Sequence, residues 1–80
     1  MEYRTQLLNL VDLYRTSSRL SDARISTLIF NHGSRIKQIR SGAGFTIKSF
    51  EKAQIWFSEH WPDDLEWPEE IDRPNKPQNK

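Results

Sequence analysis

The chain has 80 residues, of which 29% are charged and 35% hydrophobic, with a formal net charge of +1 and no cysteine. A chain of this length makes one domain with a marginal core, which a second subunit would help to stabilise. Without cysteine it offers no disulfide framework and no thiolate metal site, and a reducing, cytoplasmic setting fits. No apolar run approaches the roughly 18 residues of a membrane span, and no signal peptide is visible.

The small net charge conceals an asymmetry along the chain. Residues 1–61 carry nine Lys/Arg and five Asp/Glu, a net +4, whereas residues 62–80 carry three and six, a net −3. Between Arg15 and Arg40, six basic residues accompany one acid, Asp22. That sign suits a nucleic-acid partner, and on charge alone an ordinary solvated surface is an equally good explanation.

The first half of the chain predicts two helices. Apolar residues at helical spacing predict the first over Glu2–Ser18. Its expected inward stripe is Tyr3, Leu7, Leu10, Val11 and Tyr14. Ser21 is a natural N-cap for the second, whose expected buried side is Ile25, Leu28 and Ile29. This helix should stop near Gly33 or Asn31, either of which can supply a left-handed residue.

Two further helices and a tail follow. The segment Ser34–Ser41 reads as a short helix closed by Gly42, with Ser34 as its cap. Thr46 caps a fourth helix that runs to about Trp61, where Pro62 prevents it from continuing far. Its expected inward stripe is Ile47, Phe50, Ala53, Phe57 and Trp61. We therefore expect an all-α, four-helix domain over residues 1–61.

Residues 62–80 form an acidic, proline-rich segment without a helical stripe, which predicts an extended C-terminal tail. Its few apolar residues suggest that it folds back onto the domain at least as far as Trp67-Pro68. Disorder is expected from Arg73 to Lys80.

The second and third helices are joined by a very short turn, which is the helix-turn-helix arrangement. Its two helices cross closely, so apolar residues must fall at fixed places and the crossing point needs a small residue. Ile25 and Ile29 supply the apolar pair on one helix, and Ser26 is the small residue beside them. Ile36 and Ile39 supply the pair on the other.

With this spacing, the closing Arg40-Ser41-Gly42 and a following helix opened by Thr46, the chain resembles the lambda-repressor-like (Cro/C1-type) family of DNA-binding domains. The resemblance covers roughly Leu7–Phe57, and the Trp56-Phe57-Ser58…Trp61-Pro62 ending is similar to small alphaproteobacterial and phage regulators. The chain departs from the family pattern in the turn, where Phe30-Asn31-His32 precedes Gly33.

The resemblance implies that Ser34–Ser41 is a recognition helix that enters the major groove of double-stranded DNA. The candidates for base contact are Ser34, Arg35, Lys37, Gln38 and, at the turn, His32. The candidates for phosphate contact are Ser21, Arg24, Arg40, Ser41 and Lys48. In a competing register, Asp22–Phe30 is itself the recognition helix, with Arg24 and Thr27 reading bases. An Asp22 that faces phosphates argues against that register.

These features lead us to expect a DNA-binding transcriptional regulator of the bacterial or phage type, a repressor that acts by occlusion and is nucleoid-associated when bound. One unit reads few base pairs, so a homodimer on a two-fold site is expected. The candidates for its interface are exposed aromatic and aliphatic residues, namely Ile55, Trp56, Trp61, Leu65 and Trp67.

The alternative function is a protein-interaction module, an antiactivator or adaptor, that binds through the aromatic and acidic C-terminal segment. Trp61, Leu65, Trp67 and Ile71 are its candidate contacts. We expect no enzyme, no cofactor and no metal site, because the two histidines lie far apart and the paired carboxylates of the tail lack a scaffold.

Overall fold

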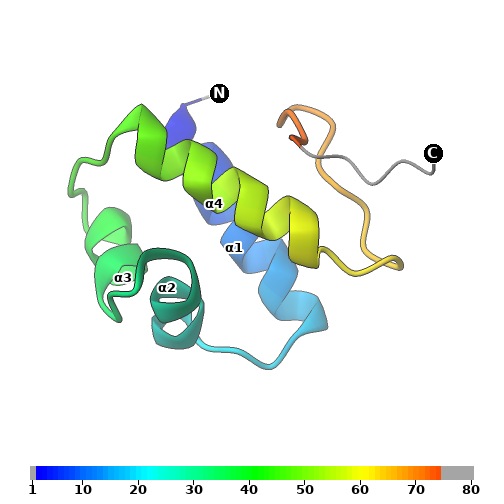
Figure 1. Cartoon of the computed structure of the whole chain (residues 1–80), viewed down its shortest axis with the longest axis horizontal. Helices are drawn as coiled ribbons and strands as arrows, with labels where there is room; N and C mark the ends of the chain where they lie inside the picture. Colours follow the sequence, from blue (N-terminus) through cyan, green and yellow to red (C-terminus); the bar gives the residue numbers. More distant parts are fainter. Residues whose placement is uncertain (1, 75–80) are drawn as a thin grey trace.

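The structure, a computed structural model, describes residues 2–74. It contains α1 (Tyr3–Ser17), α2 (Asp22–Phe30), α3 (Arg35–Arg40) and α4 (Ile47–His60), and no strand occurs within the described residues (Figure 1). The expected all-α fold is therefore confirmed. The bounds of α1, α3 and α4 agree with the predicted ranges to within one residue, and α2 ends at Phe30, next to Asn31 and three residues before Gly33.

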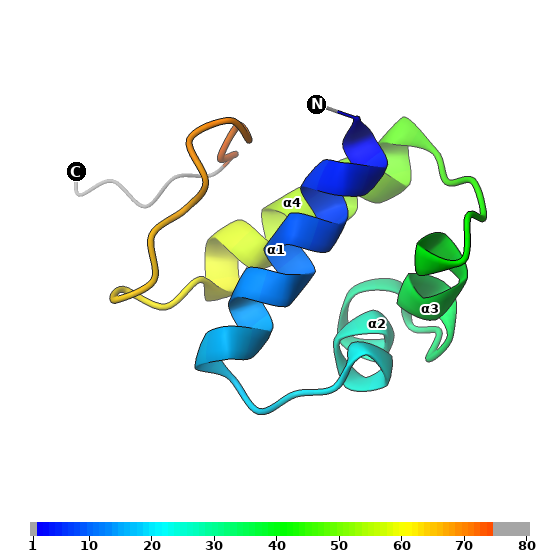
Figure 2. The same cartoon turned by 180° about the vertical axis from the view of Figure 1, so that it is seen from behind.

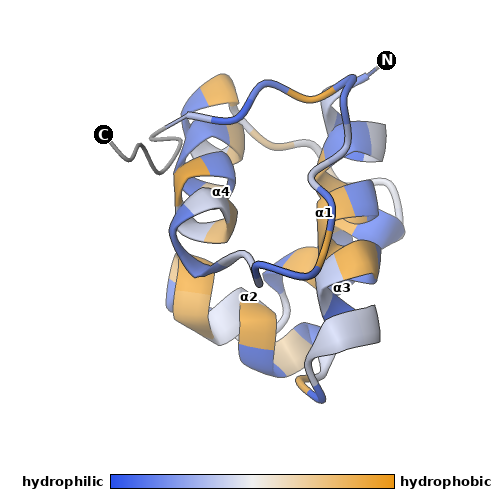
Figure 3. Ribbon diagram, turned by 90° about the vertical axis from the view of Figure 1, so that its right-hand side faces the viewer, coloured by the Kyte–Doolittle hydropathy of each residue, from blue (hydrophilic) through white to orange (hydrophobic). Residues whose placement is uncertain are grey.

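The two long helices, α1 and α4, pack along each other and form the body of the domain (Figures 1 and 2). The short helices α2 and α3 pack together on one side of that body, and the chain after α4 lies on another side. Orange and blue segments interleave along the helices in Figure 3, as in amphipathic helices that bury one face. The buried core consists of Leu7, Leu10, Val11, Ile25, Ile29, Ile36, Ile39, Phe50, Ala53, Phe57, Trp61 and Ile71.

The predicted caps of α2 and α4 form hydrogen bonds of the expected kind. The hydroxyl of Ser21 accepts a hydrogen bond of 3.1 Å from the backbone N–H of Arg24, and that of Thr46 accepts one of 3.1 Å from Ser49. Each cap satisfies one of the N–H groups that a helix N-terminus leaves free.

Three residues expected on buried stripes are instead exposed: Tyr3 by 49%, Leu28 by 41% and Ile47 by 46%. Tyr3 and Ile47 are the first residues of α1 and α4, where each helix begins and less of the domain covers it. The buried face of α2 is narrow and consists of Ile25, Ser26 and Ile29. Leu28 lies beside this face and is therefore partly exposed to solvent.

The expected domain boundary at Trp61 is too early, because the following segment completes the core. Ile71 is 2% exposed, and the indole N–H of Trp67 donates a hydrogen bond of 2.7 Å to its carbonyl. The disorder expected from Arg73 is also wrong for that residue, whose guanidinium donates to the Ser58 carbonyl at 3.0 Å. Residues 75–80 of the predicted disordered end lie outside the described residues.

Candidate functional site

The helix pair α2–α3 is joined around one buried hydroxyl. Ser26 is fully buried, and its Oγ donates to the His32 carbonyl at 2.5 Å and accepts from the backbone N–H of Ile36 at 3.2 Å. The hydroxyl thus fixes the turn to α2 and satisfies a free N–H in the first turn of α3. The structure confirms that the residue at the helix crossing is small, as predicted. Ser26 also forms two hydrogen bonds there, which a small apolar residue could not form.

The turn between the helices follows from two residues. Asn31 is the left-handed residue (φ 57°), and its N–H donates to the Thr27 carbonyl at 2.8 Å, so Asn31 rather than Gly33 ends α2. Ser34 makes no side-chain cap, contrary to expectation, because Ser26 already serves the first turn of α3. The N–H of Ser34 instead donates to Nδ1 of His32 at 3.3 Å.

One flank of α3 is held by an ion-pair network with two other helices. Nε of Arg40 lies 2.7 Å from Oδ2 of Asp22 on α2, and its Nη2 lies 2.6 Å from Oδ1 of Asp12 on α1. Arg15 also contacts Asp22, with Nη1 3.2 Å from Oδ1. The network therefore fixes α3 against both α1 and α2.

The same contacts shift the ionisation of the pair. The hydrogen bond from Arg40 lowers the pKa of the Asp22 carboxyl, against an opposing effect of desolvation, and attraction to Arg40 and Arg15 adds to the lowering. Hydrogen bonds to Asp22 and Asp12 raise the pKa of the Arg40 guanidinium. Arg40 is thus engaged within the domain, and we remove it from the predicted phosphate contacts.

A second arginine holds the chain after α3. Nη2 of Arg4, on α1, donates to the carbonyls of Gly42 and Ala43 at 3.1 Å each. Gly42 adopts φ 106°, which favours glycine and confirms its predicted role in closing the helix. The sequence pattern did not reveal Arg4 or Asp12 as supports of α3, since partners 28 to 39 residues apart leave no local signal.

With its inner face and one flank held, α3 turns the predicted contact residues outward. Ile36 and Ile39 are fully buried, whereas Lys37 and Gln38 are exposed. Ser34, Ser41 and His32 are exposed as well, and Arg35 is half-buried on the flank opposite Arg40. Exposed donors on a rigid helix are the groups that hydrogen-bond base edges in a major groove.

The predicted phosphate contacts around α3 are also exposed. Ser21 and Arg24 lie at the start of α2, and Lys48 lies in the first turn of α4. Residues 23–50 contain five Lys/Arg and no Asp/Glu. Within the described residues, none of Arg24, Arg35, Lys37 or Lys48 forms a salt bridge. Of these five cations, Arg40 is the one that pairs with carboxylates within the described part of the chain.

The pairing of Asp22 bears on the competing register as well. Because Arg40 and Arg15 neutralise its carboxylate, an Asp22 that faces phosphates no longer argues strongly against α2 as the recognition helix. Arg24 and Thr27 are exposed on α2, but Arg24 is the only cation of that helix. The greater basicity of α3 still favours the first register.

The expected dimer-interface residues are for the most part packed within the domain. Trp61 is 7% exposed and its ring lies 5.0 Å from that of Trp67, so Trp61 belongs to the core and cannot form a dimer surface. Trp56 is half-buried and stacks on His60 at 4.3 Å. Leu65 and Trp67 are half-buried, and of the five candidates Ile55 is exposed, by 38%.

Residues 2–74 contain no group of three or more His, Cys, Asp or Glu side chains placed to hold a metal ion. Over the same residues, no helix combines the length and the apolar character needed to cross a bilayer.

Comparison of the chain with known proteins found no matching protein family, no similar curated protein and no similar solved structure.

Proposed function

We propose that the protein binds double-stranded DNA in a sequence-specific manner and regulates transcription, with α3 as its recognition helix. The observation that carries this proposal is that Lys37 and Gln38 face outward from a short helix whose opposite face is fully buried. Lysine prefers the O6 and N7 acceptors of guanine, and glutamine the N6 and N7 of adenine.

The surroundings of α3 support the same proposal. Arg24 at the start of α2 and Lys48 at the start of α4 flank the recognition helix with exposed positive charge, which suits the two phosphate backbones of a groove. The exposed hydroxyls of Ser21 and Ser41 add uncharged donors to those flanks. We assign base contacts to Lys37, Gln38 and Ser34. Arg35 and His32 lie at the margins of the proposed contact surface.

We further propose that the protein binds a two-fold site as a homodimer and represses by occluding a promoter. A single recognition helix of six residues reaches few base pairs, and two copies with half-sites about 34 Å apart would provide useful affinity. Light scattering of the free protein and of its duplex complex tests this part, and one copy per duplex would contradict it.

The alternative function, an interaction module that binds through the aromatic C-terminal segment, has little exposed apolar surface to use. Trp61 and Ile71, two of its candidate contacts, are 7% and 2% exposed, and Trp67 is half-buried against Trp61. A partner could reach Trp61 and Ile71 only if the segment left the core, and Leu65 and Trp67 are each half-buried. We therefore do not propose that function on those residues.

Selection of bound duplexes from a random pool tests DNA recognition. Affinity for the selected duplex should fall steeply as salt rises, because each neutralised phosphate releases counterions. Lys37→Ala and Gln38→Ala should each change the preferred base at one position and weaken the selected duplex by about 1–3 kcal/mol. Lys48→Ala should instead weaken all duplexes alike and make the salt dependence shallower by about one unit of slope.

Lys52→Ala provides the matched control, since it removes the same charge from α4 one turn farther from the start of that helix. Its effect on affinity should be smaller than that of Lys48→Ala. Absence of duplex binding at low salt, or an unchanged base preference in both α3 variants, would refute the proposal.

A further inference from the structure

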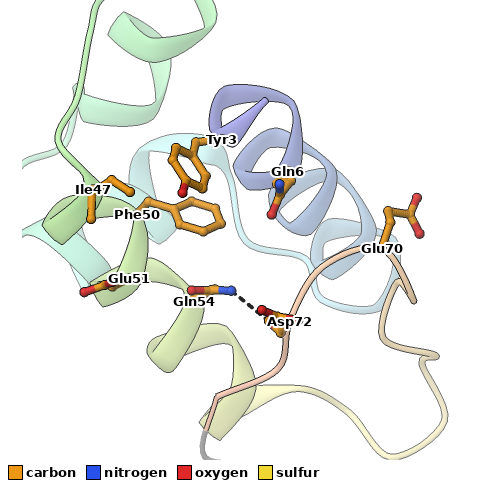
Figure 4. Close-up of a pocket in the computed structure, with 8 residues that line it drawn as sticks. All are labelled: Tyr3, Gln6, Ile47, Phe50, Glu51, Gln54, Glu70 and Asp72. Carbon is orange, nitrogen blue, oxygen red and sulfur yellow. Dashed lines mark hydrogen bonds between the residues drawn. The ribbon is translucent and has the colours of Figure 1, made fainter. Parts of the chain in front are cut away.

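Helix α4 is covered by other parts of the chain on three of its sides. On the side of α1, Phe57 is fully buried and its ring centroid lies 5.5 Å from that of Tyr14. Helix α2 packs against a second side. On a third side, Nε2 of Gln54 donates a hydrogen bond of 2.8 Å to the carbonyl of Asp72 in the C-terminal segment (Figure 4). The fourth side of α4 is left uncovered by the described residues.

The uncovered side is a ridge formed by Lys52, Ile55 and Glu59. Each of these residues lies two positions from Phe50 or Phe57, which are buried, and residues two apart on a helix point in roughly opposite directions. All three are exposed, Ile55 by 38%, and no salt bridge within residues 2–74 engages the two charged side chains. The ridge therefore carries a cation, an apolar residue and an anion in that order along the helix.

This order makes the ridge complementary to itself. In an antiparallel pair of α4 helices centred between Ile55 and Trp56, Lys52 of one copy lies opposite Glu59 of the other, because both lie equally far from the centre. The two-fold axis repeats this ion pair on the other side of the centre. A parallel pair would instead place Lys52 against Lys52 and Glu59 against Glu59, which like-charge repulsion disfavours. Charge thus selects a second copy of the chain, in the antiparallel orientation.

The same pair is compatible with recognition of one duplex by two copies of α3. In Figure 1, α4 lies in front of α1, and α2 and α3 lie together to one side of both helices. Because the ridge faces away from α1, the two-fold axis of the pair is perpendicular to α4 and is directed toward the side that holds α2 and α3. Rotation about this axis leaves both copies of α3 on the same side of the pair, as a two-fold DNA site requires.

We propose that the ridge of Lys52, Ile55 and Glu59 is the surface through which two copies pair antiparallel along α4, an inference that rests on the homodimer of the proposed function. Ile55 of each copy packs against Ile55 and the half-buried Trp56 of the other, and the two ion pairs flank this contact. Exposed ion pairs contribute little and the apolar area is small, so the contact is weak in the free protein. Two copies held on neighbouring half-sites reach a millimolar effective concentration, which favours it.

The first test measures self-association of the full chain without DNA, by sedimentation equilibrium up to about 1 mM. Glu59→Lys turns both ion pairs into repulsions and should weaken the dimer about tenfold or more. The variant should remain folded, because the helix dipole favours a cation in the last turn of α4. Lys52→Glu in the same chain restores both pairs with reversed signs and should return the dissociation constant to within about threefold of the original. Lys52→Ala, which removes an attraction without adding a repulsion, should weaken the dimer less than Glu59→Lys does.

The matched control is Glu66→Lys, which makes the same charge change at an exposed position of the C-terminal segment, away from the ridge. It should leave the dissociation constant within about twofold, because charges far from the contact are screened by salt.

A second test determines the orientation of the pair. The chain has no cysteine, so a single introduced cysteine reports one position. Under mild oxidation, Ile55→Cys should form a disulfide-linked dimer, since residues beside the two-fold axis come within reach of a disulfide. Leu28→Cys, at a position of α2 that is exposed by 41% and lies off the ridge, should form it much more slowly.

A chain that stays monomeric at about 1 mM would overturn the proposed contact. Equal losses in Glu59→Lys and Glu66→Lys, absence of rescue by Lys52→Glu, or equal cross-linking of the two cysteine variants would overturn it as well. None of these results bears on duplex binding by α3, because no DNA is present in the measurements. Absence of duplex binding would instead refute the proposed function and leave the measured contact between the copies unchanged.

Discussion

Two peripheral parts of this domain, α3 and the segment after α4, are attached to the rest of the domain by different means. Helix α3 is held at its start by the Ser26 hydroxyl, on its flank by the carboxylates that bind Arg40, and after its end by Arg4. The segment after α4 has no regular structure and is attached chiefly by buried apolar side chains, above all Trp61 and Ile71.

This difference suits what each part presents. Hydrogen bonds and ion pairs are directional, so they fix the orientation of a six-residue helix that buries little apolar area. Apolar burial is not directional but contributes more free energy per residue, which suits a segment that must close the core. The proposed DNA contacts lie on and around the first part.

The largest effect should come from Ile71→Ala, which tests whether the C-terminal segment belongs to the core. Removing a fully buried isoleucine side chain should lower the free energy of unfolding by about 2–5 kcal/mol, measured by urea denaturation. Leu28→Ala, at an exposed position of α2, should cost less than about 1 kcal/mol. Equal effects of the two variants would show that the segment is not packed as described.

Ser26→Ala should have the next largest effect, because it leaves the Ile36 N–H and the His32 carbonyl without their partner. We expect a loss of about 1–3 kcal/mol, and faster amide hydrogen exchange at Ile36. Thr27→Ala, which removes a hydroxyl at an exposed neighbouring position, should change stability by less than about 0.5 kcal/mol. Unchanged exchange at Ile36 in the Ser26 variant would contradict the bridging role.

Arg40→Gln should cost about 1 kcal/mol near neutral pH, since the network is partly exposed and screened by solvent. Asp22 has a lowered pKa in the folded state, so its contribution is complete above the ordinary aspartate pKa of about 3.9 and is lost as pH falls through the folded value. The difference in stability between the unchanged protein and the variant should therefore shrink below about pH 4.

Arg35→Gln is the control for Arg40→Gln, because it makes the same change on the same helix where no described carboxylate pairs with the side chain. Its effect on stability should be within about 0.5 kcal/mol and should not vary with pH in this range. A pH-independent loss in Arg40→Gln would mean that the guanidinium acts through packing alone.

The smallest effect should come from Gly33→Ala, which tests the geometry of the turn. The backbone of Gly33 is not left-handed, and an added Cβ would lie 3.5 Å from Oγ1 of Thr27, an ordinary contact. Alanine should therefore be neutral or stabilise by up to about 1 kcal/mol. Gly42→Ala should instead destabilise by about 1 kcal/mol, because φ there is 106°. The opposite order in thermal unfolding would indicate a different turn.

Local sequence patterns determined the helices of this protein. The hydroxyl caps at Ser21 and Thr46, the apolar spacing within each helix and the closing Gly42 all act over a few residues, so their effects are visible in the sequence. The same holds for the outward direction of Lys37 and Gln38, which follows from helical geometry once Ile36 and Ile39 are buried. The spacing of the two isoleucines alone therefore predicted which face of α3 is buried.

Only the tertiary structure decided which charged residues form ion pairs within the domain and which apolar residues of the C-terminal segment enter its core. Arg40 pairs with Asp12, 28 residues away, and Ile71 enters the core rather than a surface for a partner. The sequence could not show this, because an exposed cation and a paired one, or a surface isoleucine and a buried one in a segment without helical spacing, have the same local pattern. Their roles depend on which distant side chains the fold brings within a few ångströms, and that distance is a property of the packed chain.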